Sequence, residues 1–166
     1  DGLTLSFGPP RQIGRLLNMP GIRFEPADFV MIGAQDTSFV SIVSTTTGIK
    51  KPSDLLKAKG LVVGGRSPSS SLDIFARVPL QILGIDHNYV PGYRGQPKMK
   101  AALLGGEINA LTTGYSGHVA FYENDLLKNG TGVALYYHSA LDKNGVPIRL
   151  PQYPKNIKHF VDFYKD

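Results

Sequence analysis

Strand-like and helix-like segments alternate along residues 60–138, and this alternation constrains the fold more than any other feature of the sequence. Short runs of β-branched and apolar residues, such as 61–63 and 133–137, are typical of buried strands. Between them lie segments with apolar residues at helical spacing, such as 97–104 and 116–128. This order favours a parallel sheet covered by helices and joined by right-handed crossovers. We therefore predict an α/β fold.

Both ends of the chain add further elements. Residues 29–33 and 39–43 are apolar runs of strand length. Near the C-terminus, apolar residues of 157–164 recur at i, i+3, i+4 and i+7, which predicts an amphipathic helix. Pro79 lies too deep in the helix predicted after residue 71, so we expect that helix to end or kink near Val78.

The composition excludes several classes of protein. The chain has 166 residues, of which 42% are apolar, and no cysteine. A disulfide framework, a thiolate zinc site and a Cys nucleophile are therefore excluded. No apolar run approaches the roughly 20 residues that cross a membrane, so we do not expect a membrane-embedded protein. The basic residues behind the net charge of +5 are spread out, so nucleic acid is not an expected partner, and the excess fits an anionic solute equally well.

The segment LVVGGRSPSSSLDIF, residues 61–75, is the strongest candidate for a binding site. A strand leads into a glycine turn and then into serines at a helix start. The first N–H groups of a helix have no helical partner, and with the helix dipole they favour an anion. We expect Gly65 to allow close approach of a ligand, Arg66 to add charge, and three hydroxyls to donate, those of Ser67, Ser69 and Ser70. The alternative is that the serines only cap the helix.

Two further loops follow predicted strands and are expected at the same edge of the sheet. Thr112 and Thr113 are either hydrogen-bond donors to a polar ligand or ordinary turn residues. The other loop contains Tyr93, Arg94 and Gly95, and its lone arginine is either a ligand contact or a solvated surface charge.

No pattern of catalytic or metal-binding residues accompanies these loops. The Walker lysine and the G-x-G-x-x-G pattern of dinucleotide sites are absent, as is the G-x-S-x-G elbow of serine hydrolases. The four histidines form no H-E-x-x-H pattern, and carboxylates are too sparse near the loops for a hard cation. We therefore expect no cofactor, no metal ion and no catalytic residues.

Several segments carry a likeness to a known family. YVPGYRGQPKMKAALLGGEINA, residues 89–110, resembles the V-P-Y-K-G segment, helix and L-x-G-G-E-V-D motif of the solute-binding proteins of tripartite tricarboxylate transporters, the Bug or TctC family. Residues 61–75 resemble its G-S-S-G-x-G-S-type loop, and 50–60 its P-x-(S/D)-(D/L)-L connection. The opening DGLTLSFG is similar to its P-D-G-Y-T-L-L-x-G strand. The likeness covers 1–138.

The resemblance implies an α/β, type 2 periplasmic binding protein-like fold, with one nearly complete lobe plus part of the second lobe. Residues 1–40 would be the partial first lobe and 41–138 the second, ligand-binding lobe. Residues 139–166 would be a return segment and terminal amphipathic helix of the first lobe. Gly8 and Pro9 would face the cleft from the first lobe. The chain departs from the family pattern in lacking its N-terminal P-(F/Y)-x-x-G-G loop.

The resemblance also implies a function. Members are exported, periplasmic receptors without enzymatic activity that hold a small carboxylate between two lobes. They deliver it to membrane subunits of the transporter. The export signal is not part of this chain, which we expect to be a fragment. Two alternatives stay open: a ligand-sensing domain of a transcriptional regulator with the same fold, and an enzyme that uses the cleft.

Overall fold

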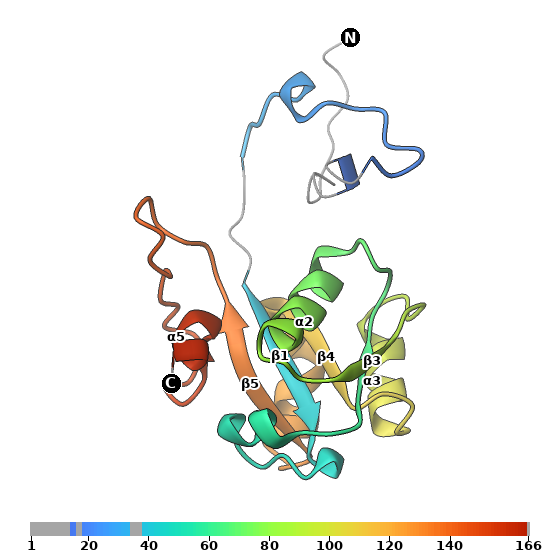
Figure 1. Cartoon of the computed structure of the whole chain (residues 1–166), viewed down its shortest axis with the longest axis vertical. Coiled ribbons are helices and arrows are strands. Elements are labelled where there is room, and N and C mark those ends of the chain that lie inside the picture. The colour runs from blue at the N-terminus through green and yellow to red at the C-terminus, as the bar shows by residue number, and fades with distance from the viewer. Residues whose placement is uncertain (1–13, 16–17, 34–37, 166) are drawn as a thin grey trace. The chain divides into compact units, whose positions relative to one another are not determined.

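The structure, a computed structural model, describes residues 14–15, 18–33 and 38–165. The chain divides into two compact units, Asp1–Gln35 and Asp36–Asp166. The sheet and the longer described helices belong to the second unit (Figure 1). In the part of the chain that is described, no helix is long and apolar enough to span a membrane.

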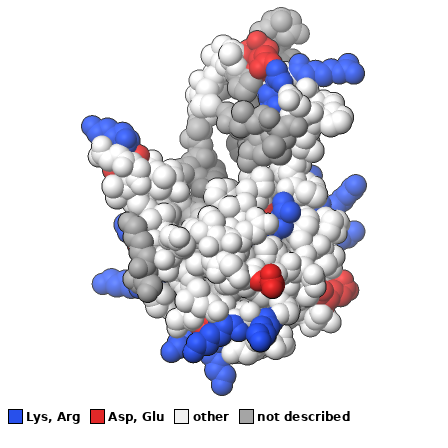
Figure 2. All heavy atoms as spheres, viewed as in Figure 1, with Lys and Arg blue, Asp and Glu red and all other residues white. Residues whose placement is uncertain are grey.

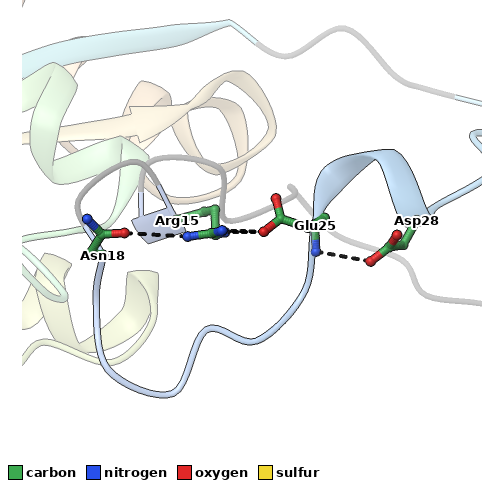
Figure 3. Close-up of polar contacts among 4 residues, drawn as sticks. All are labelled: Arg15, Asn18, Glu25 and Asp28. Atoms are coloured by element: carbon green, nitrogen blue, oxygen red, sulfur yellow. Dashed lines mark hydrogen bonds and ion pairs between the residues drawn. The ribbon is translucent and has the colours of Figure 1, made fainter.

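The first unit contains a short 3-10 helix, η1 (Pro26–Asp28), and a loop held by polar contacts (Figure 3). Nε of Arg15 donates to Oε1 of Glu25 at 2.8 Å, and a second guanidinium nitrogen pairs with the same oxygen. The N–H of Glu25 donates to Oδ2 of Asp28 at 3.3 Å. These groups lie at the surface, so the ion pair adds little to the stability of the fold.

Residues 29–33 form no strand, so this prediction is wrong. Their apolar side chains are exposed, that of Val30 to 88%. A strand needs a neighbour that satisfies its backbone N–H and carbonyl groups, and no other described segment of the first unit is a strand. An apolar run of strand length is therefore not enough to form a strand where no pairing partner is present among the described residues. The opening segment DGLTLSFG, residues 1–8, which resembles a strand of the family, lies outside the described residues.

The second unit is built on a six-stranded sheet with the order β3-β2-β4-β1-β5-β6. Its strands are β1 (Phe39–Ser44), β2 (Leu61–Gly64), β3 (His87–Val90), β4 (Ala110–Gly114), β5 (Gly132–His138) and β6 (Lys158–His159). The sheet is parallel, as predicted, except that β1 runs antiparallel to both β4 and β5. The alternation of strands and helices that predicts parallel strands begins only at residue 60, after β1. It therefore does not predict whether β1 runs parallel or antiparallel to its neighbours.

Helices connect the parallel strands and cover both faces of the sheet. They are α2 (Ser71–Ile82), α3 (Gln96–Leu104), and α4 (Tyr115–Gly117), which continues as the π-helix η4 (His118–Leu127). Two 3-10 helices, η2 (Thr45–Thr47) and η3 (Pro52–Lys57), follow β1. Apolar residues of α3 and η4 pack in one core and those of α2 in another. Neighbouring residues of β1 serve different cores, Ile42 the first and Val43 the second, as expected for a strand covered on both faces.

The helix α2 continues through Pro79 to Ile82, against the prediction that it ends near Val78, and a kink at this position stays a prediction. Proline removes one helical hydrogen bond and crowds the preceding turn. Here the last turn is anchored by burial, since Pro79 is buried and Leu80 is only 3% exposed within the second core. Packing of this turn therefore outweighs the local cost of the proline.

The C-terminal segment packs on the same sheet. β6 lies beside β5, and α5 (Phe160–Lys165) follows it, so the helix is shorter than the pattern over 157–164 predicts. The rings of Phe160 and Phe163 lie 5.0 and 5.4 Å from that of Tyr136 on β5. The predicted division into lobes assumes a complete two-lobed protein and stays a prediction. Its boundaries are 1–40, 41–138 and 139–166.

Candidate functional site

Three helices begin at one edge of the sheet, where β2, β3 and β4 end (Figure 1). The residues that precede α2, α3 and α4 are Ser70, Gly95 and Gly114, and none of them caps its helix through a side-chain hydrogen bond. Helix starts of this kind leave backbone N–H groups without helical partners and carry partial positive charge. This edge is therefore suited to receive a negatively charged or hydrogen-bond-accepting group.

Gly65 lies in the loop between β2 and α2, packed against the loop that follows β3. Its N–H donates to the carbonyl of Val90, and its own carbonyl accepts the N–H of Tyr93, each at 3.0 Å. A Cβ atom on Gly65 would lie 2.2 Å from Oδ2 of Asp73 and 2.6 Å from Cε2 of Tyr89. The absence of a side chain here makes room for the chain's own residues. Close approach of a ligand to Gly65 stays a prediction.

Asp73, in the first turn of α2, is a key residue of this loop that the sequence patterns did not reveal to us. It is 2% exposed, and its carboxylate accepts the N–H of Ser67 at 2.8 Å and the hydroxyl of Tyr89. Burial and this carboxylate raise the pKa of Tyr89, so its hydroxyl remains a donor. The chain's own carboxylate thus takes one N–H group expected to face a ligand. The spacing Ser70-x-x-Asp73 is that of a capping box, a signal that could have found it.

Arg77 holds the outer side of the same loop. Its guanidinium carbon lies 4.4 Å from the centroid of the Tyr89 ring, a cation–π contact. One guanidinium nitrogen donates to the carbonyl of Pro68 at 2.8 Å, and Nε donates to the carbonyl of Asp73 at 3.3 Å. The loop from Gly65 to Ser70 is therefore fixed from within before any ligand arrives.

The hydroxyls of Ser67, Ser69 and Ser70 hydrogen-bond to no other described residue, although all three residues are half-buried. Ser70 precedes α2 but does not cap it through its side chain. Its N–H donates to the carbonyl of Ser67 at 2.9 Å, which brings the two ends of the serine turn together. The reading in which the serines only cap the helix therefore loses support, because their hydroxyls remain available as donors.

The loop after β3 runs beside the serine loop. The hydroxyl of Tyr93 donates to Oε2 of Glu107 at 3.1 Å, and burial, with this carboxylate, raises the pKa of Tyr93. Gly95 has φ +90, a conformation that favours glycine, and directly precedes α3. Arg66 and Arg94 are exposed on their loops. The structure thus brings the Tyr93–Gly95 loop to the serine loop, and contact of these residues with a ligand stays a prediction.

Thr112 and Thr113 lie within β4 rather than in a loop, so their side chains point to opposite faces of the sheet. The hydroxyl of Thr112 is buried and lies 2.8 Å from that of Ser41. Thr113 is also buried, but it lines a hollow at the edge of the sheet. The hydroxyl of Thr113 donates to the carbonyl of Gly114 at 3.3 Å, and contact of Thr113 with a ligand stays a prediction. Gly8 and Pro9 lie outside the described residues.

The hollow has a volume of about 470 Å³ and lies where α2, α3 and α4–η4 begin. It is lined by Phe39, Leu72, Gln96, Thr113, Gly114, Ser116, Gly117, Ala120 and Phe121. Apart from Thr113, these residues were not predicted. They come from β1, α2, α3, β4 and the continuous helix α4–η4, and single residues such as Gln96 carry no pattern until the fold brings them together.

Charged side chains are dispersed over the visible face of the molecule. Figure 2 shows most Lys and Arg side chains at separate places. One group of them lies at the bottom of the view, and Figure 1 shows η2 and η3 at the same place. No described residue that lines the hollow carries a charge. The electrostatics of the hollow itself therefore come from helix starts and hydroxyl and amide groups.

No protein-family model matches the chain, and no curated protein matches its sequence. Solved structures do match. The periplasmic binding protein BugD has a TM-score of 0.58 and 14% identity, and MatC from Rhodopseudomonas palustris, solved with bound malate, has a TM-score of 0.56 and 16% identity. Each match covers 78% of this chain, but the chain spans only 41% of BugD and 45% of MatC.

At such low identity, the likeness shows the fold alone. The chain has an α/β, type 2 periplasmic binding protein-like fold, and it covers only part of these proteins. That this part is one nearly complete lobe plus part of the second lobe stays a prediction. The similarity to Bug-type proteins that the sequence motifs predict is thereby confirmed at the level of structure.

Proposed function

We propose that this chain is part of a periplasmic solute-binding protein of the Bug or TctC type. Its ligand is a small carboxylate, and its partners are the membrane subunits of a tripartite tricarboxylate-type transporter. The similar structures support binding rather than catalysis, since BugD is a periplasmic binding protein and MatC was solved with malate, a carboxylate.

The observation that carries this proposal is the set of unpartnered hydroxyls at the start of α2. Ser67, Ser69 and Ser70 are half-buried donors without a described partner, on a loop that Asp73 and Arg77 hold in place. A carboxylate accepts several hydrogen bonds at once, and the positive end of the helix dipole favours its charge. Donors fixed before binding lose little freedom when the ligand arrives, which favours affinity.

In this proposal the ligand lies between two lobes. The serine loop, Tyr93–Gly95 and Thr113 contact it from the lobe described above, and Gly8 and Pro9 approach from the other. Arg66 adds positive charge at the rim. Closure of the lobes around the ligand would be a hinge motion.

Calorimetry on the full-length protein with a panel of dicarboxylates and aromatic acids tests the proposal. Hydrogen bonds to a charged group contribute about 1.5–3 kcal/mol. Ser69→Ala combined with Ser70→Ala should therefore weaken binding by roughly 10- to 100-fold. Ser53→Ala, on η3 away from the site, is the control and should leave affinity unchanged. If the double variant binds as tightly as the natural protein, the carboxylate lies elsewhere.

A further inference from the structure

The hollow beside the serine loop has an apolar lining with a few neutral polar groups. Its apolar side chains are those of Phe39, Leu72, Ala120 and Phe121, and its polar side chains are those of Gln96, Thr113 and Ser116. The side chains of Arg66 and Arg94, on the neighbouring loops, do not line it. A carboxylate that entered the hollow would lose water and gain no cationic side chain, and the partial positive charge of the helix starts at this edge offsets only part of that cost.

Gln96 is the one amide group that lines the hollow, and its orientation is fixed from behind. Tyr122, fully buried in the core below, donates its hydroxyl to Oε1 of Gln96 at 2.8 Å. Burial raises the pKa of Tyr122, so this hydroxyl stays protonated and remains the donor. Since Oε1 is taken, the NH₂ group of Gln96 is the free end, and it hydrogen-bonds to no other described residue.

We propose that the hollow holds the apolar body of a solute with a single carboxylate, and that the NH₂ group of Gln96 donates to an uncharged oxygen on that body. This inference rests on the proposed function, in which the serine loop takes the carboxylate. Leu72 lines the hollow and lies on α2 two residues beyond Ser70, so the hollow is close enough to the serine loop for one small solute to reach both. Tyr122 acts as a positioning residue for Gln96.

Three six-carbon acids test the solute class on the full-length protein by calorimetry: hexanoate, 6-hydroxyhexanoate and adipate. They share a chain length and differ only at the far end. Adipate should bind at least about 10-fold more weakly than hexanoate, because its second carboxylate is buried without a cation. The added hydroxyl should strengthen binding roughly 5-fold through Gln96. Adipate binding as tightly as hexanoate would overturn the inference.

Variants at the hollow provide the second test. Gln96→Met keeps the size of the side chain and should abolish the advantage of 6-hydroxyhexanoate over hexanoate. Tyr122→Phe should reduce it, because Oε1 of Gln96 is then no longer held. Far-ultraviolet circular dichroism and a melting curve establish that both variants fold. A full hydroxyl advantage in Gln96→Met would assign the contact to another group and contradict the proposal.

A gain of binding gives a result that misfolding cannot imitate. Ala120 is exposed and lines the hollow, so Ala120→Lys places a cation there and should tighten adipate binding about 10-fold while leaving hexanoate little changed. Ala101→Lys adds the same charge on the exposed side of α3, outside the hollow, and should change neither. Equal gains in the two variants would mean long-range attraction and would overturn the inference.

The two proposals fail in different ways. If none of the three acids binds, the proposed function as a carboxylate receptor is wrong, and the proposed solute class is then wrong as well. If all three bind, and Ser69→Ala with Ser70→Ala weakens all of them, the proposed function stands. Equal affinity for adipate and hexanoate would then reject the inference on the hollow alone.

Discussion

The carboxylate of Asp73 accepts the backbone N–H of Ser67 at 2.8 Å, which joins the first turn of α2 to the loop before it. Tyr89 donates its hydroxyl to the same oxygen, so β3 is joined to this loop as well. A loop that carries candidate ligand donors is thus held by an internal anion. Its shape depends in part on this one buried side chain, together with Arg77 and the backbone hydrogen bonds of Gly65.

Asp73→Ala should lower the free energy of unfolding by about 1–3 kcal/mol, since the N–H of Ser67 and the hydroxyl of Tyr89 then lose a buried acceptor. Urea unfolding followed by circular dichroism measures this change. Asp86→Ala, at an exposed position, is the matched control and should change stability little. Equal losses in the two variants would show that the buried contacts contribute nothing.

Gly65→Ala should destabilise the protein by roughly 1–3 kcal/mol through overpacking. The new methyl group would lie 2.2 Å from Oδ2 of Asp73, so the carboxylate or the loop has to shift. Gly33→Ala provides the comparison, because a Cβ there would contact nothing within 4 Å. The shift in urea midpoint decides the prediction, and an unchanged midpoint in Gly65→Ala would contradict it.

Stability should fall as the pH drops from about 6.5 to about 4. Burial, with a smaller effect of His159, lowers the pKa of His138 to about 4. An unfolded imidazole binds its proton near pH 6.5. Between these two pH values the unfolded state binds more protons than the folded state. The contribution of His138 to the free energy of unfolding is therefore complete above pH 6.5. Below that pH it falls by up to about 1.4 kcal/mol per pH unit.

Melting temperatures at pH 7, 6 and 5 measure this dependence. His138→Phe should reduce the slope, because the replacement ring does not titrate. A slope unchanged in His138→Phe would assign the effect to other groups.

The hydroxyls of Ser41 and Thr112 should show strong coupling in a double-mutant cycle, since they face each other at 2.8 Å in a buried position. Thr112→Val removes one hydrogen-bond partner of Ser41, which also bonds to Tyr136, and Ser41→Ala removes the partner of Thr112. Each change should cost about 1–3 kcal/mol. Removing both should cost less than the sum of the two. Additive losses in urea unfolding would contradict the pairing. Solute affinity should be unchanged in Thr112→Val, because this hydroxyl does not reach the hollow.

Local patterns predicted much of the fold. The elements after residue 60 each have their own periodicity, and α3 and β5 lie where the sequence places them. The position of β1 between β4 and β5 is not a local property. Val40 pairs with Thr113 and with Tyr137, partners far away in the sequence, and no pattern near residue 40 specifies them. Pro79 failed as a helix breaker for the same reason, because burial of its turn depends on the rest of the core.

The candidate site was predictable only in part. The serine turn is a continuous motif, and its place at a helix start follows from the strand before it. Gln96, in contrast, gains its orientation from Tyr122, which comes from a different helix. Thr112 and Thr113 look equivalent in the sequence. They differ in the structure because β4 extends through both, so one side chain faces Ser41 and the other the hollow.

The central position of β1 also determines when the sheet can form during synthesis. The ribosome releases β1 before the two strands that flank it, so Val40, Ile42 and Val43 stay unburied while the segments between are made. The centre of the sheet is complete only after the ribosome has released β5, because β1 pairs with both β4 and β5. Pairings between such distant segments fold slowly. A chain that stops before residue 132 would leave β1 as an open edge, which is prone to pair with other chains.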